Sequence, residues 1–158
     1  MTIQVDQTMP AGTLKTMTAE GPVALSTDDI FKDKKVVLFG VPGAFTPGCS
    51  RVHLPGYVDA ADNIAAKGFD TIACVAVNDA WVMAAWGEAH GATGKVSMLA
   101  DGSADYVRAL GLELDLTAAG MGMRCKRFSM VVNDGVVESI NIDDRAIETT
   151  AAGATCGL

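Results

Sequence analysis

The residue with the clearest chemical potential in this sequence is Cys49, which closes the segment Val-Pro-Gly-Ala-Phe-Thr-Pro-Gly-Cys at positions 41–49. The segment follows an apolar run, 35–40, that is typical of a buried strand, and it precedes a stretch with helical periodicity. A cysteine at the start of a helix lies beside free backbone N–H groups and the positive end of the helix dipole. We therefore expect Cys49 to ionise easily and to react as a nucleophile.

A buried structural role is the common alternative, because free cysteines are among the most buried residues. Here the neighbours of Cys49 are Gly48 and Ser50 rather than apolar residues, and two prolines stiffen the turn. This context favours a reactive thiolate. Thr46 lies three residues earlier, so its hydroxyl shares a helical turn with the sulfur and can hydrogen-bond it, hold a bound oxygen, or simply cap the helix.

Few side chains could activate this thiol. The two histidines are His53, one turn after Cys49, and His90, at an expected exposed helix end. We interpret His53 as a packing or supporting residue, so the sequence does not favour a cysteine–histidine hydrolase. A fixed cation is the remaining route, and Arg127 is the candidate because it leads into an apolar strand, 128–132. An ordinary charge at the end of a strand is the alternative for this arginine.

The cysteine spacing argues against two other kinds of site. Cys49, Cys74, Cys125 and Cys156 lie 25, 51 and 31 residues apart. No Cys-x-x-Cys is therefore present to form a zinc site or a thioredoxin-type dithiol. We expect no metal and no cofactor. Cys74 lies in the apolar run 71–77, where a buried and inert thiol is the first interpretation.

Length and composition indicate an ordinary globular protein. The 158 residues, of which 49% are hydrophobic and 20% charged, fit a single domain over 1–158. The net charge of −7 argues against nucleic acid or an anionic membrane as a partner, since both need basic surfaces. No apolar block resembles a signal peptide or a membrane span, so we expect a soluble cytoplasmic protein.

Strands and helices alternate along the chain, which predicts an α/β fold with central parallel strands. Expected strands are 13–17, 22–25, 35–40, 71–77, 97–100, 126–132 and 136–142, and expected helices are 50–67, a segment after Asn78 or Asp79, and 103–110.

Three details of this assignment concern single residues or short segments. We expect Ser103 to cap its helix, and Trp81, Val82, Ala85 and Trp86 to face the core. The glycine-containing segment 111–124 is interpreted as a loop. For the tail, 143–158, an Ala-rich helix and an open segment are both considered.

The pattern Pro42-x-x-x-Thr46-x-x-Cys49 resembles the active-site motif of the peroxiredoxins, and the chain is similar to their type II subfamily, which includes peroxiredoxin V. The resemblance covers roughly residues 10–142, and its further blocks are 53–57, 77–80, 110–115 and 127–132. It implies a thioredoxin-like fold with a central mixed sheet flanked by helices and an N-terminal β-hairpin.

The resemblance also implies a set of roles. Cys49 would be the peroxidatic cysteine, Thr46 would orient peroxide and thiolate, Pro42 would shield the site, and Arg127 would activate the sulfur. The implied activity is thiol-dependent reduction of hydrogen peroxide and alkyl hydroperoxides for antioxidant defence, by a homodimer joined near the active-site turn. A peroxide-sensing signalling protein that uses the same cysteine is the alternative.

The sequence does not identify which thiol regenerates Cys49. Cys156 resembles the C-terminal resolving cysteine of some members, whereas Cys74 has the spacing from Cys49 found in others. Cys125 has no assigned role. If neither cysteine resolves, glutathione, a glutaredoxin or thioredoxin would supply the thiol, and an external glutathione-based reductant is the slightly favoured scheme.

Overall fold

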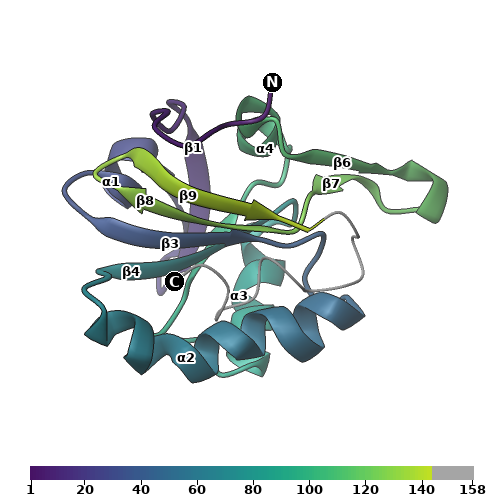
Figure 1. The fold of residues 1–158 in the computed structure, drawn as a ribbon. Helices are drawn as coiled ribbons and strands as arrows, with labels where there is room; N and C mark the ends of the chain where they lie inside the picture. Colours follow the sequence, from purple (N-terminus) through teal and green to yellow (C-terminus); the bar gives the residue numbers. More distant parts are fainter. Residues whose placement is uncertain (144–158) are drawn as a thin grey trace.

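A seven-stranded mixed sheet forms the centre of the structure, which is a computed structural model that describes residues 1–143 (Figure 1). Its order is β2-β1-β5-β4-β3-β8-β9. Strands β3, β4 and β5 are parallel, and the remaining pairs are antiparallel. The strands are β1 (Thr13–Thr18), β2 (Gly21–Ser26), β3 (Lys35–Gly40), β4 (Thr71–Ala76), β5 (Ser97–Ala100), β8 (Phe128–Asn133) and β9 (Val136–Ile142).

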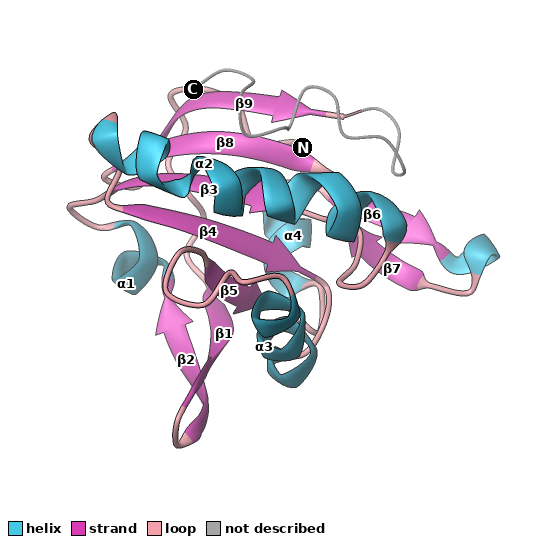
Figure 2. Cartoon of the chain, turned by 90° about the horizontal axis from the view of Figure 1, so that it is seen from below, coloured by secondary structure: helices cyan, strands magenta, loops and turns pink. Residues whose placement is uncertain are grey.

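Helices cover both faces of this sheet. Helices α2 (Leu54–Ala66) and α3 (Ala80–Ala89) pack on one face, and α1 (Thr27–Phe31) and α4 (Asp105–Leu110) pack on the other (Figure 2). Strand β3 contributes alternate residues to the two cores: Val36 and Leu38 face α1 and α4, while Val37 and Phe39 face α2 and α3. Burial on both faces explains its uninterrupted apolar sequence, and it confirms the predicted mixed sheet with an N-terminal hairpin.

The residues at several turns and helix starts are of the types that these positions favour. Ser26 and Asp29 form a reciprocal capping box at the start of α1. The side chain of Asp79 caps α3. Asp134 and Gly135 join β8 to β9 with φ angles of 48° and 78°, as expected for an Asp-Gly hairpin turn.

The prediction of a loop at 111–124 was wrong. The segment forms β6 (Glu113–Leu116), a short 3₁₀-helix (Thr117–Ala119) and β7 (Gly122–Cys125), which pair as a two-stranded arm that projects from the body (Figure 1). Along β6 exposed acidic residues alternate with half-buried leucines, which is a strand pattern. The glycines that suggested a loop serve the tip, where Gly120 and Gly122 have φ angles of 73° and 68°.

The prediction that Trp81 and Ala85 face the core was wrong, because Trp81 is 66% exposed and Ala85 is exposed. The buried side of α3 is formed by Ala80, Met83 and Trp86, of which Trp86 was predicted.

Ser103 does not cap α4. The residue at the cap is Ala104, which has a left-handed φ of 61° and no side chain able to accept a hydrogen bond. The carboxylate of the buried Asp101 accepts the backbone N–H of Val107 at 2.8 Å and so supplies the missing cap. The tail segment 144–158, including Cys156, lies outside the described residues.

Candidate active site

The proposed nucleophile sits where β3 gives way to helical structure. Strand β3 ends at Gly40, the turn 41–48 follows, and a π-helix (Cys49–His53) leads directly into α2. The predicted helix at 50–67 therefore consists of two kinds of helix. In the π-helix, Cys49 and His53 are buried whereas Arg51 and Val52 are exposed. Such wider turns are frequent at functional sites, and this one directs both buried side chains inward.

A buried arginine connects the sulfur to the histidine. Nη2 of Arg127 donates to Sγ of Cys49 at 3.3 Å, and Nη1 of Arg127 lies 2.9 Å from Nδ1 of His53. Arg127 is 1% exposed and Cys49 is 0% exposed. Because a guanidinium only donates, Nδ1 of His53 must be the unprotonated, accepting nitrogen of a neutral ring. The guanidinium thus places a donor and a positive charge within hydrogen-bond distance of the sulfur.

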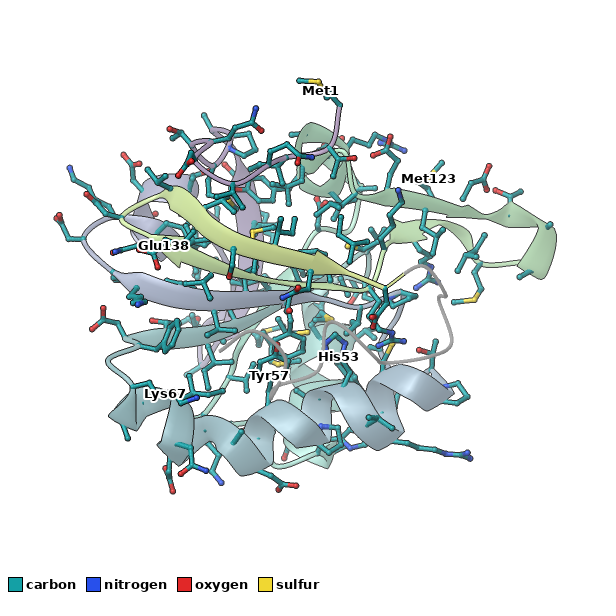
Figure 3. All side chains as sticks on the ribbon, viewed as in Figure 1. Met1, His53, Tyr57, Lys67, Met123 and Glu138 are labelled. Carbon is teal, nitrogen blue, oxygen red and sulfur yellow. The ribbon has the colours of Figure 1, made fainter. Side chains whose placement is uncertain are left out.

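His53 is held by aromatic packing as well as by the arginine. Its ring centroid lies 4.9 Å from that of Phe39 and 5.6 Å from that of Tyr57. The Phe39 and Tyr57 rings are themselves stacked at 4.0 Å. His53 and Tyr57 lie between α2 and the sheet (Figure 3). His53 thus packs against two aromatic rings and contacts Arg127, which agrees with its interpretation as a packing and supporting residue.

Arg127 reaches the sulfur because β8 pairs with β3. Gly40, at the end of β3, is opposite Phe128, the residue that follows the arginine. A Cβ atom on Gly40 would lie 2.1 Å from the Phe128 ring, so only glycine permits this close approach. The pairing brings the last residue of β3, from which the turn departs, beside the strand that carries Arg127.

The turn itself is tied together by Thr46 and buried at Pro42. The Thr46 hydroxyl donates to the Gly43 carbonyl at 2.7 Å, and the Thr46 carbonyl accepts from the Ser50 N–H at 2.9 Å. Since the hydroxyl proton is engaged, the Thr46 oxygen is available as an acceptor for a bound O–H group. Pro42 is buried and Thr46 half-buried. Thr46 therefore shapes the turn and presents an oxygen one helical turn from the sulfur.

Sequence reasoning missed Arg124, which comes from β7 at the base of the arm. Its Nε donates to the Met121 carbonyl at 2.9 Å, and its Nη1 donates to the Val77 carbonyl at 3.4 Å. Nη1 also lies 3.0 Å from the point where a Cβ on Gly43 would stand. The sequence offered only a weak signal for Arg124, its position three residues before Arg127. That signal was not used because the segment 111–124 was interpreted as a loop.

The other described cysteines are buried free thiols. Burial raises the pKa of Cys74 well above its usual value, and nearby Cys49 and Cys125 add to this effect. Burial likewise raises the pKa of Cys125, whose Sγ donates to the Lys126 carbonyl at 3.1 Å. Neither is poised to act as a nucleophile at neutral pH.

Two searches of residues 1–143 gave negative results. No group of three or more His, Cys, Asp and Glu side chains in this range could hold a metal ion. No helix in the same range is long and apolar enough to cross a membrane.

Comparisons with known proteins agree with this geometry. The Redoxin family model matches residues 4–154. Peroxiredoxin-2C of Oryza sativa subsp. japonica is 42% identical over 153 residues, which cover 96% of this chain and 94% of that protein. Reduced Prx3 from Vibrio vulnificus, in a crystal structure with H₂O₂, is 49% identical with a TM-score of 0.91, covering 96% of this chain and 94% of that one.

A second solved structure gives the same result at lower identity. Peroxiredoxin 5 from Alvinella pompejana is 35% identical with a TM-score of 0.81, and the match covers 92% of each chain. These likenesses confirm a thioredoxin-like fold and the activity of a thiol peroxidase, which reduces peroxides with electrons from a thiol. The chain belongs to the redoxin family and, within it, to the peroxiredoxins.

Proposed function

We propose that Cys49 is the peroxidatic cysteine of this thiol peroxidase and that Arg127 activates it. The observation that carries this assignment is the 3.3 Å hydrogen bond from Nη2 of Arg127 to Sγ of Cys49 inside the core. Among residues 1–143, Cys49 is the one cysteine whose sulfur accepts a hydrogen bond from a cationic side chain. A thiolate, rather than a thiol, attacks peroxides, so this sulfur is the one prepared to react.

In the proposed reaction the Cys49 thiolate attacks one oxygen of the peroxide. A sulfur–oxygen bond forms as the O–O bond breaks, and the departing oxygen takes the electron pair. With one proton it leaves as water from hydrogen peroxide, or as an alcohol from an alkyl hydroperoxide. The sulfur is oxidised to a sulfenic acid and the peroxide is reduced.

The surrounding groups favour the transition state of this step. Arg127 can stabilise the negative charge that moves from sulfur to the departing oxygen, because its guanidinium is already in place. The Thr46 oxygen can accept the O–H of the peroxide and orient it. Buried Pro42 shields the sulfur from bulk water. Full burial of Cys49 favours hydrogen peroxide and small alkyl hydroperoxides, whose reactive end is narrow.

The central assignment predicts which cysteine consumes peroxide. Reduced wild-type protein should consume one equivalent of hydrogen peroxide in a single turnover, and Cys49→Ser should consume none because serine lacks the reacting sulfur. Cys74→Ala is the matched control, since it removes another buried thiol and should leave peroxide consumption intact. Full consumption by Cys49→Ser would disprove the assignment.

The same assay separates a peroxidase from the alternative, a sensor. With an excess of thiol a peroxidase keeps consuming peroxide, whereas a sensor stops after one equivalent.

We infer that an external thiol regenerates Cys49. The sulfenic acid condenses with a thiol, R–SH, to form a Cys49–S–S–R disulfide and water, and a second thiol then releases the reduced enzyme. Cys74 and Cys125 are buried, and their raised pKa values keep them protonated at neutral pH. Glutathione, with or without a glutaredoxin, is the proposed reductant, and thioredoxin is the other candidate. Cys156 is the remaining internal candidate.

This inference predicts the product of a single oxidation. After one equivalent of peroxide and an excess of glutathione, mass spectrometry of the intact and digested protein should find a mixed disulfide between Cys49 and glutathione. The Cys156→Ser variant should give the same product in the same yield. A disulfide from Cys49 to Cys156 or to Cys74 that forms in preference to the glutathione adduct would contradict it.

We also propose that the protein forms a homodimer through the face around the active-site turn. Phe45 and Val52 are each 55% exposed and Trp81 is 66% exposed. A hydrogen bond of 3.0 Å from the Ala44 N–H to Oδ1 of Asn78 ties the turn to the start of α3, which brings Phe45 and Trp81 onto neighbouring segments. Phe45 has a left-handed φ of 63°, an unusual conformation for this residue, and its ring is presented outward.

The dimer proposal predicts a specific effect of charge at this face. Burying a large apolar side chain contributes about 1.5–3 kcal/mol, so Trp81→Glu should raise the dimer dissociation constant by about tenfold or more in sedimentation equilibrium. The control is Val23→Glu, which introduces the same charge on the exposed strand β2 and should not change the constant. Equal effects of both substitutions, or a wild-type monomer, would refute this interface.

A cytoplasmic location completes the proposal, because the cycle requires a compartment that returns Cys49 to the thiol. Cell fractionation tests it, and recovery of the protein in an oxidising compartment alone would exclude it.

A further inference from the structure

We propose that Arg124 binds a carboxylate of the molecule that reacts at Cys49, and that the main source of this carboxylate is an anionic thiol reductant. The inference rests on the proposed function of Cys49. It adds a second arginine to the site, with a role in recognition rather than in the chemical step.

The position of Arg124 is fixed from two sides. The Met121 carbonyl, at the tip of the arm, holds its Nε at 2.9 Å, and the Val77 carbonyl, just beyond the end of β4, holds its Nη1 at 3.4 Å. The preceding residue, Met123, lies on the arm in Figure 3. Two backbone anchors from separate elements restrict the guanidinium to one place.

That place is beside the active-site turn, next to Gly43. Nη1 of Arg124 lies 3.0 Å from the point where a Cβ on Gly43 would stand, and Cγ2 of Thr46 lies 3.2 Å from the same point. The Gly43 carbonyl also accepts the Thr46 hydroxyl. The absence of a side chain at Gly43 therefore lets the guanidinium approach the turn next to the threonine proposed to hold peroxide.

The charge of Arg124 has no partner in the part of the chain that the structure describes. Neither ion pair found there involves it, and its two hydrogen bonds both go to neutral carbonyls. A guanidinium has five N–H donors, so several remain for a ligand. Arg124 is half-buried, which makes an ion pair stronger than at a fully exposed site while leaving the group accessible.

The two arginines then have different tasks. Arg127 is buried against the sulfur and acts on the charge that moves during the reaction. Arg124 is half-buried beside Gly43 of the turn, where an arriving molecule can place a carboxylate while its thiol sulfur attacks the Cys49 sulfenic acid. In that step an S–S bond forms, the S–O bond breaks, and the hydroxyl leaves with the thiol proton as water. Planar bidentate geometry suits a guanidinium to a carboxylate.

The test compares two thiols of similar size that differ in charge, 3-mercaptopropionate and 2-mercaptoethanol. Both react with the sulfenic acid formed by one equivalent of hydrogen peroxide in a Cys156→Ser background, and rates are corrected for the thiolate fraction of each thiol. A charge-assisted hydrogen bond contributes about 1.5–3 kcal/mol, so the carboxylate thiol should react about tenfold to a hundredfold faster. In Arg124→Gln this preference should disappear, and in Arg124→Lys it should be intermediate.

The control is Arg51→Gln, which removes the same charge from an exposed position on the π-helix and should preserve most of the preference. A second arm uses reduced protein with a small alkyl hydroperoxide that carries a carboxylate, and with the methyl ester of the same hydroperoxide. A charge preference in this arm that Arg124→Gln abolishes would assign the carboxylate to the peroxide instead of the thiol.

The outcomes separate this inference from the function on which it rests. Failure of peroxide to oxidise Cys49 would overturn the proposed function. Normal oxidation with no charge preference in either arm, or a preference that survives in Arg124→Gln, would overturn the role of Arg124 alone. Circular dichroism and thermal unfolding of Arg124→Gln and Arg124→Lys would show whether a lost preference came with a folded protein.

Discussion

The contact between the Arg127 guanidinium and the Cys49 sulfur is the interaction on which the rest of the site depends. A buried cation costs several kcal/mol unless its donors find good acceptors. Here Cys49 Sγ accepts from Nη2 of the guanidinium, and His53 Nδ1 accepts from Nη1. In the proposed account the dependence is mutual, because the cation activates the sulfur while the sulfur and the imidazole accommodate the cation. Reactivity and local stability therefore have the same origin.

The paired strands and the π-helix of the fold hold Arg127 and Cys49 in the positions that this contact needs. Strand β3 carries the turn and the pairing with β8 brings Arg127 beside it, across a sequence separation of 78 residues. Because Gly40 has no side chain, the Phe128 ring can lie against it while β3 and β8 stay paired. The π-helix then turns His53 inward, against Phe39 and Tyr57. Rigid placement of this kind is what preorganised electrostatic catalysis requires.

Much of this could be predicted from the sequence where the signals are local. The apolar run of β3 and the Pro/Gly turn marked the position of Cys49 between a strand and a helix, and Asp79 marked the start of the next helix. The sequence named Arg127 as a candidate cation, but its contact with Cys49 could not be derived from the sequence because the strand pairing that brings the two together is non-local.

The remaining features had signals that were ambiguous or absent. A π-turn barely alters the helical periodicity of 50–67, so the wider turn at Cys49–His53 could not be distinguished from an ordinary helix start. The arm was missed because glycines at its tip outweighed a short alternation of acidic residues and leucines. With the arm unrecognised, nothing indicated that Arg124 reaches back to the active-site turn.

The most direct test of the central claim is the second-order rate constant for oxidation of Cys49 by hydrogen peroxide in Arg127→Gln, compared with wild type at the same pH by stopped flow. Loss of one preorganised donor to a developing charge typically costs about a hundredfold or more in rate. The account predicts a fall of that size in a protein whose circular dichroism is unchanged. A folded Arg127→Gln variant whose rate constant stays within about twofold of wild type, far from that expected loss, would contradict it.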